Sequence, residues 1–405
     1  MIIEMRMKKI AIYLITVLLS VAAASCGGDR PDVPGRPAEH ATLVYMVAAN
    51  SLGTAYPAQG VSKADSLDLD EMVLAARRGD LGSNRWLVFH STYKGNRLLE
   101  LTASGLKELK NYGAVYATDA AVMQQVIADV KRIAPAENYG IVLWSHASGW
   151  LEDGAEDFVA ARADAPAAVP LSYGQHGGRT MNTTTLRHVL EDENLEYIYF
   201  DCCLMGGVEV MYELRDCARY IVSSPSELPR DGMPYDRNLG LLAAGGPDNI
   251  VRAAQNTFEL YQSKSDPVDR TATMTVVDTR SLERLAEATR AIYILTEPSH
   301  PLRPVTNYYG SDRVSQGYYL DFGEYVTALH GRADLDGALL AEFESALGST
   351  VIYKASTDRL WNDWTMYNVS GLSTRVVTRA EDLPIKGYDR LEWTQNVVAP
   401  RFKTN

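Results

Sequence analysis

Cysteine is scarce in this sequence, and its distribution excludes two classes of protein. Only four cysteines occur among the 405 residues, at positions 26, 202, 203 and 217. If Cys26 is modified, as argued below, an odd and clustered set remains, which cannot form a disulfide framework. The sequence also contains no Cys-x-x-Cys pair, so we expect no zinc site from the other three cysteines.

Basic residues are outnumbered as well. The chain has 39 Lys and Arg against 51 Asp and Glu, which gives a formal net charge of −12. Nucleic acid is bound mainly through positive surfaces, so we expect no nucleic-acid partner. The hydrophobic content of 46% is typical of a globular protein, and the length permits one large core or two smaller ones.

Long apolar stretches are almost absent, and the one at the N-terminus indicates secretion. Arg6, Lys8 and Lys9 precede a mainly apolar run from Ile10 to Val21. That run is too short to span a bilayer as a helix, and it has the layout of a secretory signal. We therefore expect residues 1–25 to be a signal peptide that is removed.

The end of this signal resembles the lipobox of bacterial lipoproteins. Ala23-Ala24-Ser25-Cys26 would make Cys26 the lipidated first residue of the mature chain, although a plain signal peptide that happens to contain a cysteine is the alternative. No aspartate follows the anchor, which by the same resemblance favours the outer membrane. Residues 26–41, with three prolines, are interpreted as the anchor and its tether. The predicted location is the cell envelope, with contact to the membrane only through the lipid.

The body of the chain alternates short apolar runs with segments of helical periodicity. This alternation is typical of a doubly wound α/β fold with a parallel sheet. The expected strands are 42–48, 85–90, 139–145, 196–201 and 219–224, and the expected helices are Ala64–Arg77, Ala120–Ile133 and Val208–Ala218.

Two potentially reactive side chains follow predicted strands. His146 comes just after the strand 139–145, and Cys203 just after the strand 196–201. In parallel sheets reactive groups gather at the carboxyl ends of the strands. A thiol becomes a strong nucleophile as a thiolate, and an imidazole or the start of a helix near Val208 would lower its pKa. His90 also ends a strand, so it is the alternative base.

The surrounding residues suit acyl transfer. Gly206 and Gly207 allow a tight turn into the next helix. The backbone N–H groups of the loop that begins at Ala147 are candidates to stabilise an oxyanion.

These motifs resemble those of a known peptidase family. SHASGW (145–150), followed about fifty positions later by FDCCLMGG (200–207), is similar to the paired motifs of the clostripain family of cysteine peptidases, relatives of gingipains and caspases. The resemblance implies a caspase-like three-layer α/β/α sandwich with a mainly parallel central sheet. It also implies that His146 is the catalytic histidine and Cys203 the nucleophile, while Cys202 falls on a variable position.

The similarity extends over most of residues 42–380. It includes LVYMVAANSL (43–52), SSPSELPRDGMPYD (223–236) and SGLSTRVV (370–377). We therefore expect one peptidase unit over 42–405, with its core at about 42–240 and the C-terminal part packed on that core. The sequence departs from the family at Ala147, which replaces a glycine, and at Ala49, which replaces an aspartate. By resemblance, the backbone N–H groups of Ala147 and Cys203 form the oxyanion hole.

The substrate preference is predicted from Asp201. It lies two residues before Cys203, so strand alternation places it on the nucleophile's face, and in the resembling family this position lines the pocket for the residue before the cut. A carboxylate there would bind Arg or Lys. The alternative is that Asp201 only caps the helix or bonds the loop backbone. The sequence thus predicts an endopeptidase acting on proteins or peptides after basic residues.

Three further features, an acidic cluster, a group of tyrosines and the segment 151–180, are open to more than one interpretation. The acidic cluster Asp65, Asp68, Asp70 and Glu71 is interpreted as a solvated helix start; we expect no cofactor and no metal ligands, although the calcium dependence of clostripain leaves Ca²⁺ open. The tyrosines at 308, 309, 318 and 319 fit packing better than a glycan platform. Self-cleavage in 151–180, at Arg162 or Arg179, is a hypothesis.

A rival function comes from a different class. A surface lipoprotein that keeps the peptidase scaffold only to bind protein or glycan would also fit the anchor. The presence of both His146 and Cys203 at strand ends argues against it, because a pure binding protein has no need of the pair.

Overall fold

The computed structural model describes residues 37–55, 63–152, 172–301, 305–309 and 317–403. The chain divides after Arg36 into two units, Met1–Arg36 and Pro37–Asn405. The first unit, with the predicted signal and Cys26, lies outside the described residues. Among the residues that the structure describes, no helix has the length and apolar character needed to cross a membrane.

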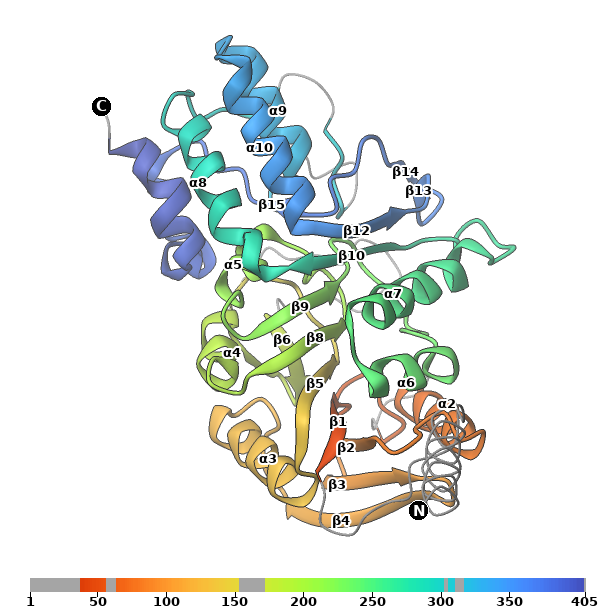
Figure 1. Ribbon diagram of the computed structural model, residues 1–405. Coiled ribbons are helices and arrows are strands. Elements are labelled where there is room, and N and C mark those ends of the chain that lie inside the picture. Colours follow the sequence, from red (N-terminus) through yellow and green to blue (C-terminus); the bar gives the residue numbers. More distant parts are fainter. Residues whose placement is uncertain (1–36, 56–62, 153–171, 302–304, 310–316, 404–405) are drawn as a thin grey trace, which may run out of the picture. The chain divides into compact units, whose positions relative to one another are not determined.

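A nine-stranded sheet forms the centre of the second unit (Figure 1). Its five inner strands are parallel, and antiparallel strands extend both edges. In spatial order the strands are β12 (Val351–Ser356), β10 (Thr273–Asp278), β9 (Ala218–Ser223), β8 (Leu195–Asp201), β5 (Ala136–Trp144), β1 (Ala38–Val47), β2 (Arg85–Thr92), β3 (Gly95–Thr102) and β4 (Gly105–Gly113). The predicted α/β fold class is confirmed.

Helices cover both faces of this sheet, which gives the three layers (Figure 1). One face packs against α3 (Ala120–Ile133), α4 (Thr183–Leu190) and α5 (Val208–Glu213), and the other against α2 (Ala64–Arg77), α6 (Tyr235–Ala244) and α7 (Pro247–Gln262). The C-terminal part adds α8 (Leu282–Tyr293), α9 (Phe322–Ala333) and α10 (Gly337–Thr350).

Smaller elements complete the described chain. Three two-stranded sheets pair β6 (Tyr173–His176) with β7 (Arg179–Met181), β11 (Leu320–Asp321) with β15 (Ser373–Thr374), and β13 (Arg359–Leu360) with β14 (Trp364–Thr365). Short helical turns occupy Thr279–Ser281, Ala380–Asp382, Ile385–Arg390, Thr394–Val398 and Ala399–Phe402.

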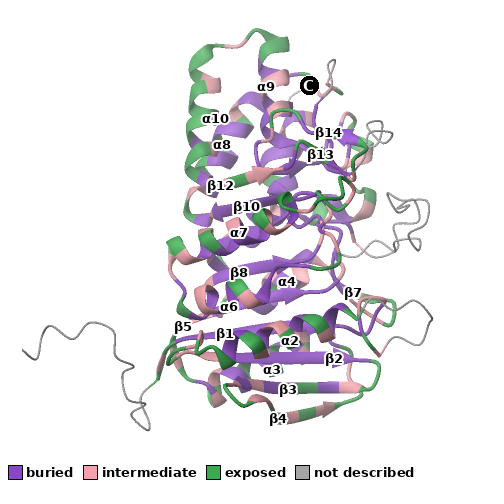
Figure 2. Ribbon diagram, turned by 90° about the vertical axis from the view of Figure 1, so that its right-hand side faces the viewer, coloured by how far each residue is buried: buried purple, intermediate pink, exposed green. Residues whose placement is uncertain are grey.

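The inner strands are apolar because both of their faces are buried, as Figure 2 shows. Side chains alternate between the faces along each strand. In β8, Ile198 and Phe200 join the core on the α3, α4 and α5 side, whereas Tyr197 and Tyr199 join the core on the α2, α6 and α7 side. The sheet therefore separates two cores.

Two of the three predicted helices have the predicted bounds, and the third is shorter. Helix α5 ends at Glu213 rather than Ala218, because the chain turns there through Arg215 N–H to Tyr212 O and Cys217 N–H to Leu214 O before entering β9. Cys217 therefore does not lie on a continuous helix from Val208. Its thiol is buried and donates to Arg187 O at 3.7 Å.

The predicted tether is also too long at its C-terminal end. Strand β1 begins at Ala38, whose N–H donates to Pro135 O, and Ala41 is fully buried. Residues 38–41 therefore belong to the folded unit, since they pair with β5 at the edge of the core. The hairpin strands β3 and β4 were not predicted either.

Candidate active site

His146 and Cys203 follow two neighbouring strands and occupy equivalent positions in the strand register. Strands β5 and β8 are parallel, and Trp144 lies opposite Asp201 in their register. His146 and Cys203 are each two residues beyond that pair. Because adjacent strands are about 4.8 Å apart, both residues emerge at one edge of the sheet, as the sequence predicts.

The two side chains have different hydrogen-bond partners. Nε2 of His146 lies 2.9 Å from Ser51 Oγ, and Sγ of Cys203 lies 3.6 Å from the carbonyl oxygen of Leu228. Burial lowers the pKa of His146 to about 4. The imidazole is therefore neutral at pH 7 and available as a base.

The pKa of the Cys203 thiol is raised rather than lowered. Burial and the nearby carboxylate of Glu227 raise this pKa to about 12, since both disfavour a negative sulfur. The sequence-based expectation of a lowered pKa is wrong for this arrangement, because burial of the thiol and the charge of Glu227 dominate. The thiol of Cys203 and the imidazole of His146 are therefore both neutral at pH 7.

Ala147 adopts an unstrained backbone although it replaces a glycine. It is not among the residues of positive φ, whereas Gly149 has φ 70°. Ala147 bridges antiparallel to Tyr173, with Gly174 N–H donating to His146 O and Ser148 N–H to Ser172 O. In this pattern the N–H of the residue between them points away from the partner strand. Ala147 therefore retains a donor directed away from β6.

The loop that follows His146 (the histidine loop) and the loop that contains Cys203 (the cysteine loop) are in contact at Gly149. A Cβ added there would lie 2.7 Å from Leu204 O, so only glycine fits at this contact. Leu204 itself has φ 61°, which is rare for a residue with a side chain. The close approach of the two loops thus depends on unusual backbone conformations in both.

Cys202 and Asp201 point to opposite faces of the sheet. Cys202 is buried in the core on the α3, α4 and α5 side. Asp201 is buried on the other side, where it accepts hydrogen bonds from Met233 N at 3.0 Å and Tyr235 Oη at 3.0 Å. These two successive side chains thus lie on opposite faces, and the structure includes the backbone bond that was the alternative role of Asp201. The placement of Asp201 on the face of Cys203 stays a prediction.

Asp201 is covered by the turn that follows β9. A Cβ on Gly232 would lie 2.9 and 3.0 Å from the two carboxylate oxygens. Tyr261 Oη donates to Gly232 O at 2.6 Å and holds this turn. Asp201 therefore does not line an open pocket in this arrangement.

A second carboxylate accompanies Asp201. Asp68 of α2 is buried and accepts from Trp144 Nε1 at 2.6 Å. Burial and the charge of Asp201 raise the pKa of Asp68 well above its usual range, and burial likewise raises that of Asp201. Both carboxylates are buried. Among the described residues, no basic side chain forms an ion pair with either of them.

A cavity of about 490 Å³ reaches Asp68 from the surface. It lies at the same edge of the sheet as the two loops, since its walls come from the start of α2, the start of α6 and the end of α7. The charged residues in its lining are Asp68, Asp70, Glu71, Arg230, Asp231, Asp236, Arg237 and Lys264.

The acidic cluster is therefore only partly a solvated helix start. Asp68 faces the cavity described above, and Asp65 is buried, with its Oδ2 3.0 Å from His90 Nε2. The interpretation from sequence is wrong for these two, because the helix face that carries them packs against the sheet. The signal that could have revealed this is their helical spacing with buried Met72.

His90 is a structural partner of Asp65 rather than a neighbour of Cys203. It lies on β2, three strands from β8 in the order of the sheet, which corresponds to about 14 Å. The position of β5 beside β8 favours His146 over His90.

Other candidate features lie away from this edge. Tyr308, Tyr309 and Tyr319 are buried, which agrees with packing. In the part of the chain described here, no three His, Cys, Asp or Glu side chains are grouped as metal ligands. Arg162 lies outside the described residues, and the guanidinium of Arg179 stacks 3.8 Å from the ring centroid of Tyr116.

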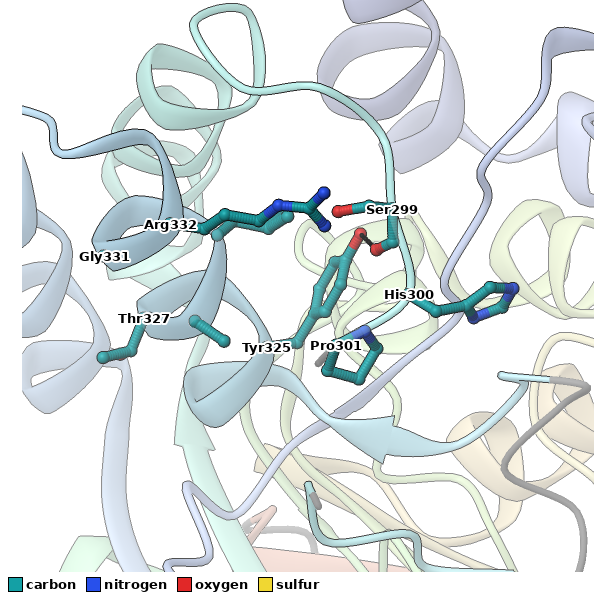
Figure 3. Close-up of a pocket in the computed structure, with 9 residues that line it drawn as sticks. Ser299, His300, Pro301, Tyr325, Thr327, Gly331 and Arg332 are labelled. Carbon is teal, nitrogen blue, oxygen red and sulfur yellow. Dashed lines mark hydrogen bonds between the residues drawn. The ribbon is translucent and has the colours of Figure 1, made fainter. Parts of the chain in front are cut away.

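Figure 3 shows a separate cavity of about 290 Å³ in the C-terminal part. It lies between α9 and residues 299–301, where Tyr325 Oη donates to Ser299 O at 3.3 Å. Neither His146 nor Cys203 lines it.

The C-terminal segment 373–390 reaches both loops, which sequence reasoning did not anticipate. Ser373 N–H donates to Gly206 O in the cysteine loop at 2.9 Å. The Arg375 guanidinium lies 5.1 Å from the ring of Trp150, in the histidine motif, and 4.6 Å from that of Tyr388. The only signal was the resemblance of SGLSTRVV, which assigned no role to these residues.

Comparisons with known proteins identify the family of this chain. The family model described as "Clostripain family" matches residues 44–318. This chain belongs to the clostripain family. It is a cysteine-type peptidase, and its substrates are proteins or peptides. No curated protein matches it.

Two solved structures resemble this clostripain-family chain along most of its length. One is a secreted C11 cysteine protease from Bacteroides thetaiotaomicron, "iotapain", with TM-score 0.75 and 22% identity over 89% of this chain and 99% of that one. The other is an inactive zymogen C11 protease from Parabacteroides distasonis, with TM-score 0.73 and 24% identity over 90% and 99%. At these identities the likeness shows the fold.

The raised pKa of Cys203 predicts how the free peptidase reacts with iodoacetamide. Below the pKa the thiolate fraction rises about tenfold per pH unit. The alkylation rate of Cys203, followed by mass spectrometry of its peptide, should therefore increase from pH 6 to pH 10 without reaching a plateau. Cys203→Ser identifies the background from other thiols. A plateau below pH 8 would contradict the neutral pair.

Proposed function

We propose that this peptidase is an endopeptidase in which Cys203 attacks the peptide bond and His146 is the base. The observation that carries the proposal is the matched position of the two residues, each two beyond the Trp144–Asp201 pair of adjacent parallel strands. A side chain from each strand end can then converge on one carbonyl group. His90, bound to Asp65 three strands away, lacks this placement.

The proposed reaction has two steps that use the same pair. In the first, the thiol proton of Cys203 passes to His146 as sulfur bonds to the carbonyl carbon, and the carbonyl oxygen takes the negative charge. The C–N bond then breaks, and the imidazolium gives its proton to the leaving amine. In the second, water attacks the thioester carbon as its proton passes to His146. The C–S bond then breaks, and the imidazolium returns the proton to sulfur, which restores the thiol.

The oxyanion is proposed to bind the N–H groups of Ala147 and Cys203. Ala147 supports this role because its bridge to Tyr173 directs its N–H away from β6. Such donors stabilise the charge that develops in the transition state.

We further propose cleavage after Arg or Lys. The support is the buried carboxylate pair of Asp68 and Asp201, whose pKa values are raised mainly by burial and whose ionised forms a cation would stabilise. A basic side chain entering the cavity of α2, α6 and α7 meets Asp68 first, and Gly232 must move for it to reach Asp201. Binding of the cation would then offset the cost of burying two carboxylates.

The cell-envelope location is a separate proposal. It rests on the signal-like residues 1–25 and on the lipobox-like sequence before Cys26. Incorporation of labelled palmitate into the full-length chain, lost in Cys26→Ala, is the measurement that decides it.

The roles of the cysteines and histidines can be separated by alanine variants. Cys203→Ala and His146→Ala should each lower kcat/KM by about a thousandfold or more, because each removes a reacting group. Cys202→Ala and His90→Ala should keep substantial turnover of the same peptide. If Cys202 proved essential and Cys203 dispensable, the assignment of the nucleophile would be wrong by one residue.

Asp201→Asn tests the preference for basic residues. Loss of a buried charge partner costs about 2–5 kcal/mol of transition-state binding, so kcat/KM for peptides with Arg before the cut should fall at least about thirtyfold. The alkylation rate of Cys203 should change much less. Tyr235→Phe is the matched control, since it removes a hydrogen bond to Asp201 and keeps its charge.

Two results would reject this specificity while leaving the Cys203–His146 mechanism intact. One is equal turnover of peptides with Ala, Asp or Arg before the cut. The other is an Asp201→Asn variant that cleaves basic substrates as wild type does.

A further inference from the structure

We infer that Ser51 is a positioning residue that holds His146 in the orientation and tautomer of the base. This inference rests on the proposed pairing of His146 with Cys203. Its starting point is the 2.9 Å contact between Ser51 Oγ and His146 Nε2. Among the described residues, this hydroxyl is the one side-chain hydrogen-bond partner of the imidazole.

The loop that carries Ser51 is built to keep the hydroxyl in place. Asn50 is buried, and its amide donates to Val47 O at 2.8 Å, to Gln175 O at 2.9 Å and to Ser145 Oγ at 3.2 Å. Its Oδ1 accepts from Leu52 N at 2.9 Å. Since Ser145 immediately precedes His146, Asn50 ties the serine loop to the histidine loop.

Glycine at position 53 closes the same loop. A Cβ there would lie 1.9 Å from Ala48 O, so the chain can pass only without a side chain. Gly53 N–H donates to Asn50 O, and Ala64 N–H, at the start of α2, donates to Leu52 O. Ser51 thus lies between two residues whose backbone is held by several bonds, which is the support that a positioning group needs.

The contact with Nε2 determines which ring nitrogen of His146 can act as the base. In the tautomer that we infer, Nε2–H donates to the Ser51 hydroxyl and Nδ1 is unprotonated, so Nδ1 is the nitrogen that takes the thiol proton. When the imidazolium forms, the Nε2–H bond to Ser51 becomes charge-assisted and stronger. Ser51 therefore favours the charged intermediate that burial of His146 alone disfavours.

The test compares Ser51→Ala and Ser51→Thr in the full chain. Ser51→Ala should lower kcat roughly tenfold to a hundredfold with KM changed by less than about threefold, because the base is misplaced while substrate contacts remain. Ser51→Thr, which keeps the hydroxyl, should restore most of kcat. Ser66→Ala, at a half-buried serine of α2, is the control for removing a hydroxyl elsewhere.

The ¹⁵N chemical shifts of the His146 imidazole supply a readout independent of activity. In Cys203→Ala they should report a single Nε2–H tautomer, and in Cys203→Ala with Ser51→Ala a mixture of both. The inference is overturned if Ser51→Ala keeps both wild-type kcat and the single tautomer, or if Ser51→Thr fails to recover kcat while the shifts stay unchanged. Wild-type activity of Cys203→Ala would instead reject the proposed nucleophile, and the shifts would still report on Ser51.

Discussion

The edge of the sheet that carries the reactive residues depends on one buried carboxylate, that of Glu209. This residue lies in the first turn of α5, after the cysteine loop, and is fully buried. Its Oε1 accepts from Thr374 Oγ1 at 2.8 Å, Arg375 N at 2.8 Å and Tyr388 Oη at 3.0 Å. Burial raises its pKa, so the cost of placing a carboxylate here is offset only while these three donors stay together.

Those donors all belong to the C-terminal segment, so Glu209 attaches that segment to the cysteine loop. Arg375 extends the attachment to the histidine loop, because its guanidinium lies among the rings of Trp150, Tyr318 and Tyr388 and donates to Asp382 O at 2.8 Å. Cation–π contacts of this kind are stronger when they are removed from water. The two reactive loops are therefore positioned from outside the parallel strands that carry them.

The electrostatics of the site are those of a resting enzyme. A neutral thiol bonded to Leu228 O and a neutral imidazole bonded to Ser51 need no internal counter-charge. The carboxylates of Asp68 and Asp201, by contrast, are held at raised pKa values by burial. In the function proposed above, positive charge enters the site with the basic substrate and with the protonation of His146.

The sequence by itself determined the parallel strands, two helices to the residue, and the placement of His146 and Cys203 at one edge. It could do so because hydrophobic periodicity and strand alternation are local properties of the chain. The early end of α5, the burial of Asp65 and Asp68, and the raised pKa of the thiol were not predictable in this way. Each depends on which distant side chains remove water from a group, and only the tertiary structure decides that.

The contacts of Ser51, Glu209 and Arg375 likewise could not be predicted from the sequence. The hydrogen bonds of Ser51 to His146 and of Glu209 to Arg375 and Tyr388 join residues separated by 95 to 179 positions, and nothing in the local pattern of a serine or a glutamate specifies a partner so far away. The sequence motifs point to His146 and Cys203, and the strand order brings these two residues to one edge of the sheet. Their positioning groups come from loops and from the C-terminal segment, and the packing of the whole unit alone brings these into place.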